Sequence, residues 1–383
     1  MSETTTLELA GSGNEVQRRV VAACDALLPV WLGLYVVSLA TAMSGMEIFS
    51  SLLSLTLGVR LLVALPAGFR WEWPPFSIPL LLFSAVIVLG VMFGRADWPD
   101  KVHDLGRLRF FLVYGALFYY FRFWQPAPRA WLRPLVAVVL VVGVYGIVQH
   151  FIPLDLVRPA GKQIIMFSQP DLKIGPMVLG TFNHHLTFSN IYLFYACVFL
   201  GLALYGASKR WAYGALAGLV LLLCFWSYSR AAWLAIPISV GVLLLPQGKK
   251  RVGISVLLAV LLAVVLFVSS PAALERGLRP FLASEEGLTL TPRFRLWQIQ
   301  FELFKSSPLI GVGWNNNERF CAESFHKLFP GAQFDFCGHA HSTLLQVLST
   351  TGILGVAAFL MLWGAIFGRL WRGSVDFARG SFE

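Results

Sequence analysis

The stretch WAYGALAGLVLLLCFWSYSRAAWLAIPISVGVLLLPQ, residues 211–247, decides the fold class. It carries a single charged residue, Arg230. An apolar run of roughly 20 residues is long enough to cross the hydrocarbon core of a bilayer as an α-helix. We therefore predict two membrane-spanning helices here, at 211–229 and 231–247, with Arg230 between them.

The same pattern extends over most of the chain. The 383 residues are 57% hydrophobic and 13% charged, about half the charged fraction of a soluble globular protein. That composition argues against a soluble enzyme, a disordered chain and a fibrous protein. We predict an all-α polytopic membrane protein with a bundle of about 10–12 transmembrane helices. The other apolar runs of suitable length lie at 21–43, 47–66, 76–94, 106–124, 134–152, 184–206, 252–271 and 353–371.

Basic residues predict the orientation of this bundle. Lysine and arginine concentrate in three loops without acids, all on one side of the membrane if the N-terminus is cytoplasmic. By the positive-inside rule, both termini are expected in the cytoplasm. The net charge of +10 then indicates membrane topology rather than nucleic-acid binding. The residues concerned are Arg122, Arg129 and Arg133; Lys209 and Arg210; and Lys249, Lys250 and Arg251.

The predicted organisation has one large outer loop. It lies at 272–341, and its segment RFRLWQIQFELF, residues 293–304, has the apolar period of an amphipathic helix. The segment 342–351 is expected to form an outer helix or half-span rather than part of the last crossing. No cleavable signal peptide is apparent, so the first span is expected to remain as an anchor. The full division is a cytoplasmic tail at 1–20, a helical bundle at 21–271, the loop at 272–341, a final helix and span at 342–372, and a cytoplasmic tail at 373–383.

Standard catalytic and metal-binding motifs are missing from the sequence. It contains no Gly-rich phosphate loop, HExxH, CxxC or GxSxG pattern. The adjacent acids Glu285 and Glu286 are typical of a solvated turn. The expected chemistry is therefore independent of metal, with no cofactor.

Three arginines are candidates for binding an anion. Arginine is costly at membrane depth and usually faces a partner or a cavity, which favours a functional Arg230, although snorkelling to the headgroups is the alternative. Arg293 and Arg295 lie two residues apart and do not share a helix face. One of them is expected to point into a site, and interfacial anchoring is the alternative for both.

Histidines on the same side of the membrane are candidates for proton transfer. His339 and His341 precede the last span, and an imidazole that titrates near neutral pH suits a general base. His184 and His185 begin an earlier span. They are candidates for substrate binding, with helix capping or packing as the alternative.

Two further pairs of residues are predicted to have structural roles. Cys321 and Cys337 both fall in the outer loop and are predicted to form a disulfide if that side is oxidising. Asp25 and Arg60 are charges within predicted spans, for which we expect a structural or snorkelling role.

Three motifs resemble the bacterial O-antigen ligase and polymerase superfamily. YSRAAWLA, residues 228–235, is similar to its Ser-Arg-Gly/Ala segment, and PRFRLWQ with SSPLIGVGWN, residues 292–298 and 306–315, to its outer-loop run. His341-Ser342 followed by nine residues and GILG, residues 352–355, resembles the ligase signature. GTFNHHLTFSN, residues 180–190, also looks like a family segment. The family usually has about twelve spans, and ten are predicted here.

The resemblance implies a lipid-to-lipid glycosyl transfer on the periplasmic face of a Gram-negative inner membrane, by an enzyme with a fold similar to glycosyltransferase C. The donor would be an undecaprenyl-pyrophosphate-linked polysaccharide and the acceptor the lipid A-core. His341 would be the general base, with Arg230 and Arg293 on the pyrophosphate. Arg295, His339, His184, His185 and Trp297 would bind substrate.

Several alternatives stay open. An O-antigen polymerase would use the same donor with a growing glycan as acceptor, and a protein O-oligosaccharyltransferase is a third possibility within the superfamily. A membrane transporter would belong to another class. A transporter is expected to place its charges near the bilayer midplane and often has inverted repeats, whereas here the candidate residues lie toward one face.

Overall fold

The computed structural model is helical throughout the part of the chain that it describes. Among those residues there is no β-strand, which confirms the predicted all-α class. The described residues are 15–64, 72–94, 105–106, 108–124, 128–152, 154–158, 176–206, 208–244, 290–314, 316–331 and 339–378, with isolated positions between 253 and 274.

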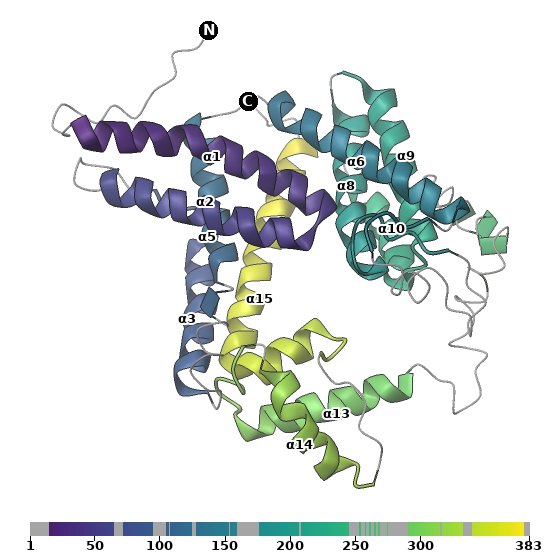
Figure 1. The fold of residues 1–383 in the computed structure, drawn as a ribbon. Helices are drawn as coiled ribbons and strands as arrows, with labels where there is room; N and C mark the ends of the chain where they lie inside the picture. Colours follow the sequence, from purple (N-terminus) through teal and green to yellow (C-terminus); the bar gives the residue numbers. More distant parts are fainter. Residues whose placement is uncertain are drawn as a thin grey trace. The chain divides into compact units, whose positions relative to one another are not determined.

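Nine of the ten predicted spans coincide with described helices, and the span at 252–271 lies largely outside the described residues. Within the described residues, five helices are long and apolar enough to cross a membrane, and three are apolar but shorter. The protein is an all-α polytopic membrane protein. The spans correspond to α1 (Glu15–Thr41), α2 (Met43–Ala64), α3 (Ser77–Phe93), α5 (Arg109–Tyr119) continued by the π-helical η2 (Tyr120–Trp124), α6 (Pro128–Phe151), α8 (His185–Tyr205), α9 (Arg210–Trp226), α10 (Arg230–Leu244) and α15 (Thr343–Ala378) (Figure 1).

The chain divides into two compact units, which are described separately. Unit 1 contains residues 1–17, 61–123 and 283–376. Unit 2 contains residues 18–60, 124–282 and 377–383. Each unit therefore combines segments that are distant in the sequence.

The core of unit 2 lies where α8 packs on α9. Phe188, Tyr192 and Phe199 of α8 are fully buried there with Val220 and Leu223 of α9. The rings of Phe188 and Tyr192 stack with their centroids 4.2 Å apart. Aromatic side chains bury a large area and add a stacking term, so this contact anchors the unit.

One buried ion pair joins α1 to α2. Arg60 Nε donates to Asp25 Oδ1 at 3.0 Å, and Arg60 is only 4% exposed. A charge within an apolar bundle is tolerated when it is paired. The structural role that we expected for these two residues is thus the one that the structure shows.

Unit 1 combines membrane helices with the outer loop. Phe83, Ile87 and Val91 of α3 form a core with Val347 and Ala358 of α15. The loop contributes α13 (Leu290–Ser306) and α14 (Asn317–Leu328), which pack against each other (Figure 1). The amphipathic helix predicted at 293–304 is confirmed as part of α13.

A break at Gly352 divides α15. Gly352 has φ 64° and ψ −165°, which is not helical. Residues 343–351 therefore form a separate short helix before the last span, in agreement with the predicted separation of this segment from the last crossing; its place on the outer side stays a prediction. The backbone at the break is bonded by the loop that follows α13: Val312 N–H donates to the Ser349 carbonyl at 2.9 Å, and Ile353 N–H to the Pro308 carbonyl at 2.9 Å.

The glycines of this crossing have a steric role. A Cβ on Gly352 would lie 2.3 Å from the Leu309 carbonyl oxygen, and one on Gly311 (φ 69°) would lie 2.3 Å from the carbonyl carbon of Thr350. Only glycine reaches such positive φ values without strain and leaves space for a second backbone. The LIGVG part of the outer-loop motif, residues 309–313, is thus the segment that crosses the break in α15.

Gly352→Ala is expected to destabilise the protein by at least about 2 kcal/mol. The added Cβ would clash with the backbone of Leu309, and alanine would be strained at the positive φ of this position. The thermal midpoint of the purified protein measures this. Gly364→Ala in the same helix, where a Cβ meets nothing within 4 Å, is the matched control. Equal midpoints for the two variants would contradict the steric role of Gly352.

Candidate functional site

In unit 1, His341 is held in an unusual backbone conformation just before α15. Its φ is 48°, in the left-handed region that few non-glycine residues occupy. The ring of His339 contacts that of His341 edge to face, with centroids 3.9 Å apart. Both side chains are exposed. The two imidazoles therefore form an accessible pair at the N-terminal end of the outer helix 343–351.

Hydrogen bonds from three elements fix the residue between these histidines. The buried Ala340 donates its N–H to Gln346 Oε1 at 2.9 Å, and its carbonyl accepts from Trp297 Nε1 at 3.0 Å. Gln346 Nε2 in turn donates to Asn317 Oδ1 of α14 at 2.7 Å. α13, α14 and α15 thus all contribute to positioning His341.

The electrostatic surroundings of His341 favour its neutral form. Partial burial lowers the pKa of this imidazole, and the neighbouring His339 and Arg293 lower the pKa further. Desolvation and nearby positive charge both disfavour an imidazolium. The lowered pKa favours the neutral form of His341, which can accept a proton.

The two arginines of α13 interact with different residues. Arg293 acts electrostatically on His341, whereas the guanidinium of Arg295 lies over the ring of Phe329, 5.5 Å from its centroid. This divergence follows from their spacing of two residues on a helix. Of this pair, Arg293 is the one whose charge acts on the pKa of His341.

The α13–α14 pair is a small folded unit. Ile299 and Leu303 pack on Phe325, and Glu302 Oε1 accepts from Lys327 Nζ at 2.5 Å. Hydrogen bonds from Lys327 and then Lys305 lower the pKa of the Glu302 carboxyl. Cys321 is disulfide-bonded. Its predicted partner, Cys337, lies outside the described residues.

A buried hydroxyl–amide contact fixes α13 against α15. Ser349 Oγ donates to Gln300 Oε1 at 2.5 Å, and both residues are at most 1% exposed. Buried polar groups are stabilising only when they are paired. This contact sets the position of α13, and therefore of Arg293 and Trp297, relative to the outer helix.

In unit 2, His184 and His185 bind backbone. His184 is the N-cap of α8 and accepts from the Leu186 N–H through Nδ1 at 3.1 Å. His185 is buried, with Nδ1 2.7 Å from the Ser227 carbonyl oxygen. The capping and packing roles that we gave as an alternative are thus present in the structure, and substrate binding by these residues stays a prediction.

Arg230 is the first residue of α10 and is partly buried. Before it, Tyr228 has a φ of 54°, and the buried Ser229 accepts from the Ala232 N–H through Oγ at 3.4 Å. The turn that carries Arg230 also supplies Ser227 to His185. The segments 184–185 and 227–230 therefore lie together, as the sequence did not predict.

Sequence reasoning missed a polar cluster beside this turn. Gln149 Oε1 accepts from the Gly180 N–H at 2.8 Å, and Gln149 Nε2 donates back to the Gly180 carbonyl at 2.9 Å. Arg158 Nη1 donates to Asp155 Oδ2 at 2.6 Å, and its Nη2 donates to the carbonyls of Gly180 and Phe182. These residues shape the GTFNHH segment. No local sequence signal indicates these contacts, because Gln149 and Arg158 lie 31 and 22 positions before Gly180.

The pair Asp155–Arg158 is ionised. Burial acts to raise the pKa of the Asp155 carboxyl, but hydrogen bonds from Arg158, the Val157 N–H and Tyr145 outweigh it, and the net shift lowers the pKa. The side chains of both residues are almost fully inaccessible to solvent. A buried carboxylate with this many donors acts as a fixed structural anchor.

The predicted site residues thus form two groups. Unit 1 holds His339, His341, Arg293 and Trp297 around one backbone segment, with Arg295 turned to Phe329. Unit 2 holds His184, His185 and Arg230 around the turn before α10. Within the described residues no group of three or more His, Cys, Asp or Glu could hold a metal ion.

The part of the chain that contains both arginine-bearing elements and His341 matches a known family. Residues 215–360 match the family model described as O-Antigen ligase. This segment is similar to that family and makes up less than half of the chain. It includes α10, α13 and α14 and ends within α15, so the crossing at Gly352 lies within the matched segment.

One curated protein is similar to this chain over a short stretch. The chain is 35% identical over 89 residues to "Exopolysaccharide production protein ExoQ" of Rhizobium meliloti (strain 1021). That alignment covers 22% of this chain and 20% of the relative. The chain therefore matches about a fifth of that protein's length.

Gln346→Leu is expected to release the histidine segment. The change leaves the buried Ala340 N–H and the Asn317 amide without their partner, at a cost of roughly 1–3 kcal/mol for each unsatisfied group. The thermal midpoint should fall, and His341 should react faster with diethylpyrocarbonate. Leu345→Met, a substitution of similar volume at the neighbouring position, is the control; the same changes in both variants would contradict this role of Gln346.

Proposed function

We propose that this protein is a glycosyltransferase that ligates a polysaccharide from undecaprenyl pyrophosphate to the lipid A-core on the periplasmic face of the inner membrane. The observation that carries the proposal is the exposed pair of His339 and His341, with ring centroids 3.9 Å apart, within the segment that matches the O-antigen ligase family. The lowered pKa of His341 supports it. The spacing of His341 to the GILG segment favours a ligase within that superfamily.

The proposed reaction is a single displacement. His341 removes the proton from an acceptor sugar hydroxyl as that oxygen attacks the anomeric carbon of the donor. The bond from this carbon to the pyrophosphate oxygen breaks, and the electron pair leaves with undecaprenyl pyrophosphate. Attack from the side opposite the leaving group inverts the anomeric centre.

Arginine suits the other half of this chemistry. A pyrophosphate leaving group gains negative charge as the glycosidic bond breaks, and preorganised cations stabilise charge that develops in a transition state. The guanidinium is permanently charged and binds phosphate oxygens through two parallel N–H donors. Arg293 has this role in the proposal, with Arg295 and His339 binding substrate nearby, and the same role for Arg230 stays a prediction from its sequence motif.

The backbone at His341 determines which variant tests the base. Because φ is 48°, His341→Ala would combine the loss of the imidazole with backbone strain, whereas asparagine tolerates positive φ. His341→Asn is expected to reduce transfer by roughly 100- to 10,000-fold, the usual contribution of a general base. The assay offers purified protein a lipid-linked glycan donor with either lipid A-core or free glycan as acceptor.

The controls separate the alternatives. His326→Asn removes an exposed imidazole from α14 and should leave transfer unchanged. Full activity of His341→Asn would overturn the base assignment, and transfer only to free glycan would favour a polymerase. Loss of activity in EDTA would overturn the metal-independent mechanism, and movement of the lipid-linked glycan without transfer would favour a transporter.

The pH profile gives an independent test. If neutral His341 is the base, transfer is retained at neutral pH and falls as the pH drops through the lowered pKa of this imidazole. His339→Gln removes a neighbouring positive charge that lowers this pKa, so the acid limb should move to higher pH. An unchanged acid limb in this variant, with His326→Gln as control, would argue that another group titrates.

A further inference from the structure

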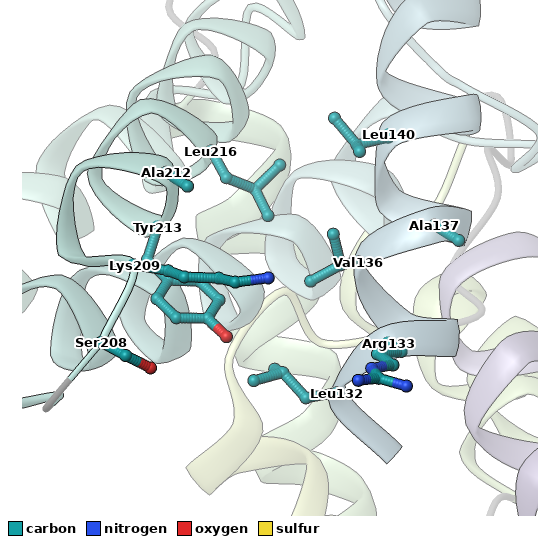
Figure 2. Close-up of a pocket in the computed structure, with 10 residues that line it drawn as sticks. All are labelled: Leu132, Arg133, Val136, Ala137, Leu140, Ser208, Lys209, Ala212, Tyr213 and Leu216. Atoms are coloured by element: carbon teal, nitrogen blue, oxygen red, sulfur yellow. The ribbon is translucent and has the colours of Figure 1, made fainter. Parts of the chain in front are cut away.

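Unit 2 contains a cavity of about 630 Å³ between the N-terminal parts of α6 and α9. The two helices approach closely farther along, where Gly143 and Gly146 of α6 lie against Leu223 of α9. The cavity lies between the two helices on the Arg133 and Lys209 side of that contact (Figure 2). It is therefore lined by the N-terminal parts of both helices.

Two cations line this cavity near the start of the two helices. Arg133 comes from α6 and Lys209 immediately precedes α9, and Figure 2 shows the Lys209 side chain extending toward α6. Both are exposed, and neither has an ion-pair or hydrogen-bond partner for its side chain among the described residues. None of the ten residues that line the cavity is acidic. This end of the cavity is therefore suited to an anion.

Helix dipoles and a tyrosine hydroxyl add to the attraction of the two cations for an anion. α6 and α9 both begin near these cations, so the positive ends of their dipoles lie at this end of the cavity. Tyr213 also lines the cavity, and its phenol can donate to a phosphate oxygen. The adjacent Arg210 differs from Lys209, because its guanidinium already donates to the carbonyls of Ala203 and Leu204 at the end of α8.

Beyond the cations the walls become apolar. Val136 and Leu140 of α6 face Leu216 of α9. Trp211, next to the cavity, is 93% exposed, and an exposed tryptophan at the end of a membrane helix is typical of the headgroup level. The combination of cations at the interface and an apolar interior fits an amphiphile rather than a free anion.

We infer that this cavity binds an anionic phospholipid of the surrounding membrane. Its phosphate lies between Arg133 and Lys209, and an acyl chain lies along Val136, Leu140 and Leu216. Basic pockets between membrane helices recognise anionic lipid headgroups in this way. The positive-inside pattern predicts that the lipid comes from the cytoplasmic leaflet, so this site is independent of the transfer chemistry.

Native mass spectrometry of the full chain in detergent tests the inference. Phosphatidylglycerol is added and compared with phosphatidylethanolamine that has the same acyl chains. Wild-type protein should retain phosphatidylglycerol selectively. In Arg133→Gln/Lys209→Gln, its apparent affinity should fall about thirtyfold, which corresponds to about 2 kcal/mol for two cations.

Two further variants keep the test decisive. Arg369→Gln/Arg372→Gln removes the same charge from exposed positions of α15 and should change lipid retention less than twofold. Ala212→Phe fills the cavity without altering its charge and should reduce retention even if the double pocket variant fails to fold. Equal binding of the two lipids, equal loss in the α15 control, or full retention in Ala212→Phe would overturn the inference.

Inorganic phosphate distinguishes a lipid site from a free-anion site. At millimolar concentration it should leave phosphatidylglycerol bound, because it cannot use the apolar walls. Displacement of the lipid by phosphate, with phosphate adducts that are lost in the double variant, would show a site for free anions and overturn the lipid assignment.

Discussion

The break in α15 depends on backbone hydrogen bonding at Gly352. A membrane helix that stops and restarts leaves carbonyl and N–H groups without helical partners, and these must be satisfied by protein when water is scarce. Here the chain after α13 supplies the partners, through Val312, Gly313 and Pro308. This single crossing fixes the outer loop onto the last span, and with it the surface that carries the histidines.

The site in unit 1 is built outward from that crossing. The outer helix 343–351 exists because α15 is interrupted, and its N-terminal end presents His341. Ser349 binds Gln300, Gln346 binds Asn317 and Ala340, and Trp297 binds Ala340 from the opposite side. The exposed imidazoles thus rest on a buried polar layer of linked side chains, the arrangement that holds a reactive group in one geometry.

Much of the fold could be predicted because its determinants are local. Apolar runs of about 20 residues predict spans without knowledge of their neighbours, and the period of residues 293–304 predicts α13. The separation of Arg293 from Arg295 follows from helix geometry alone. Even the detached outer helix at 342–351 was accessible, since polar residues and a glycine separate it from the following apolar run.

Side-chain contacts between residues far apart in the sequence could not be predicted. Gln346 and Asn317 are 29 positions apart, and no local pattern indicates that two amides will meet. Arg158 and Gln149 reach Gly180 across similar separations, so they appeared to be ordinary loop or span residues. The backbone contacts of His184 and His185 could not be predicted for the same reason. Their bonds to Leu186 and Ser227 depend on how α8, α9 and α10 pack.

The ion pair between Asp25 and Arg60 bears on biogenesis. Ala42 alone separates α1 from α2, and either charge by itself would cost roughly 2.5–3.5 kcal/mol on insertion at the centre of a bilayer. The pair removes most of that penalty only when both helices are present. The first two helices are therefore suited to enter the membrane together as a helical hairpin in which the aspartate and the arginine are already paired.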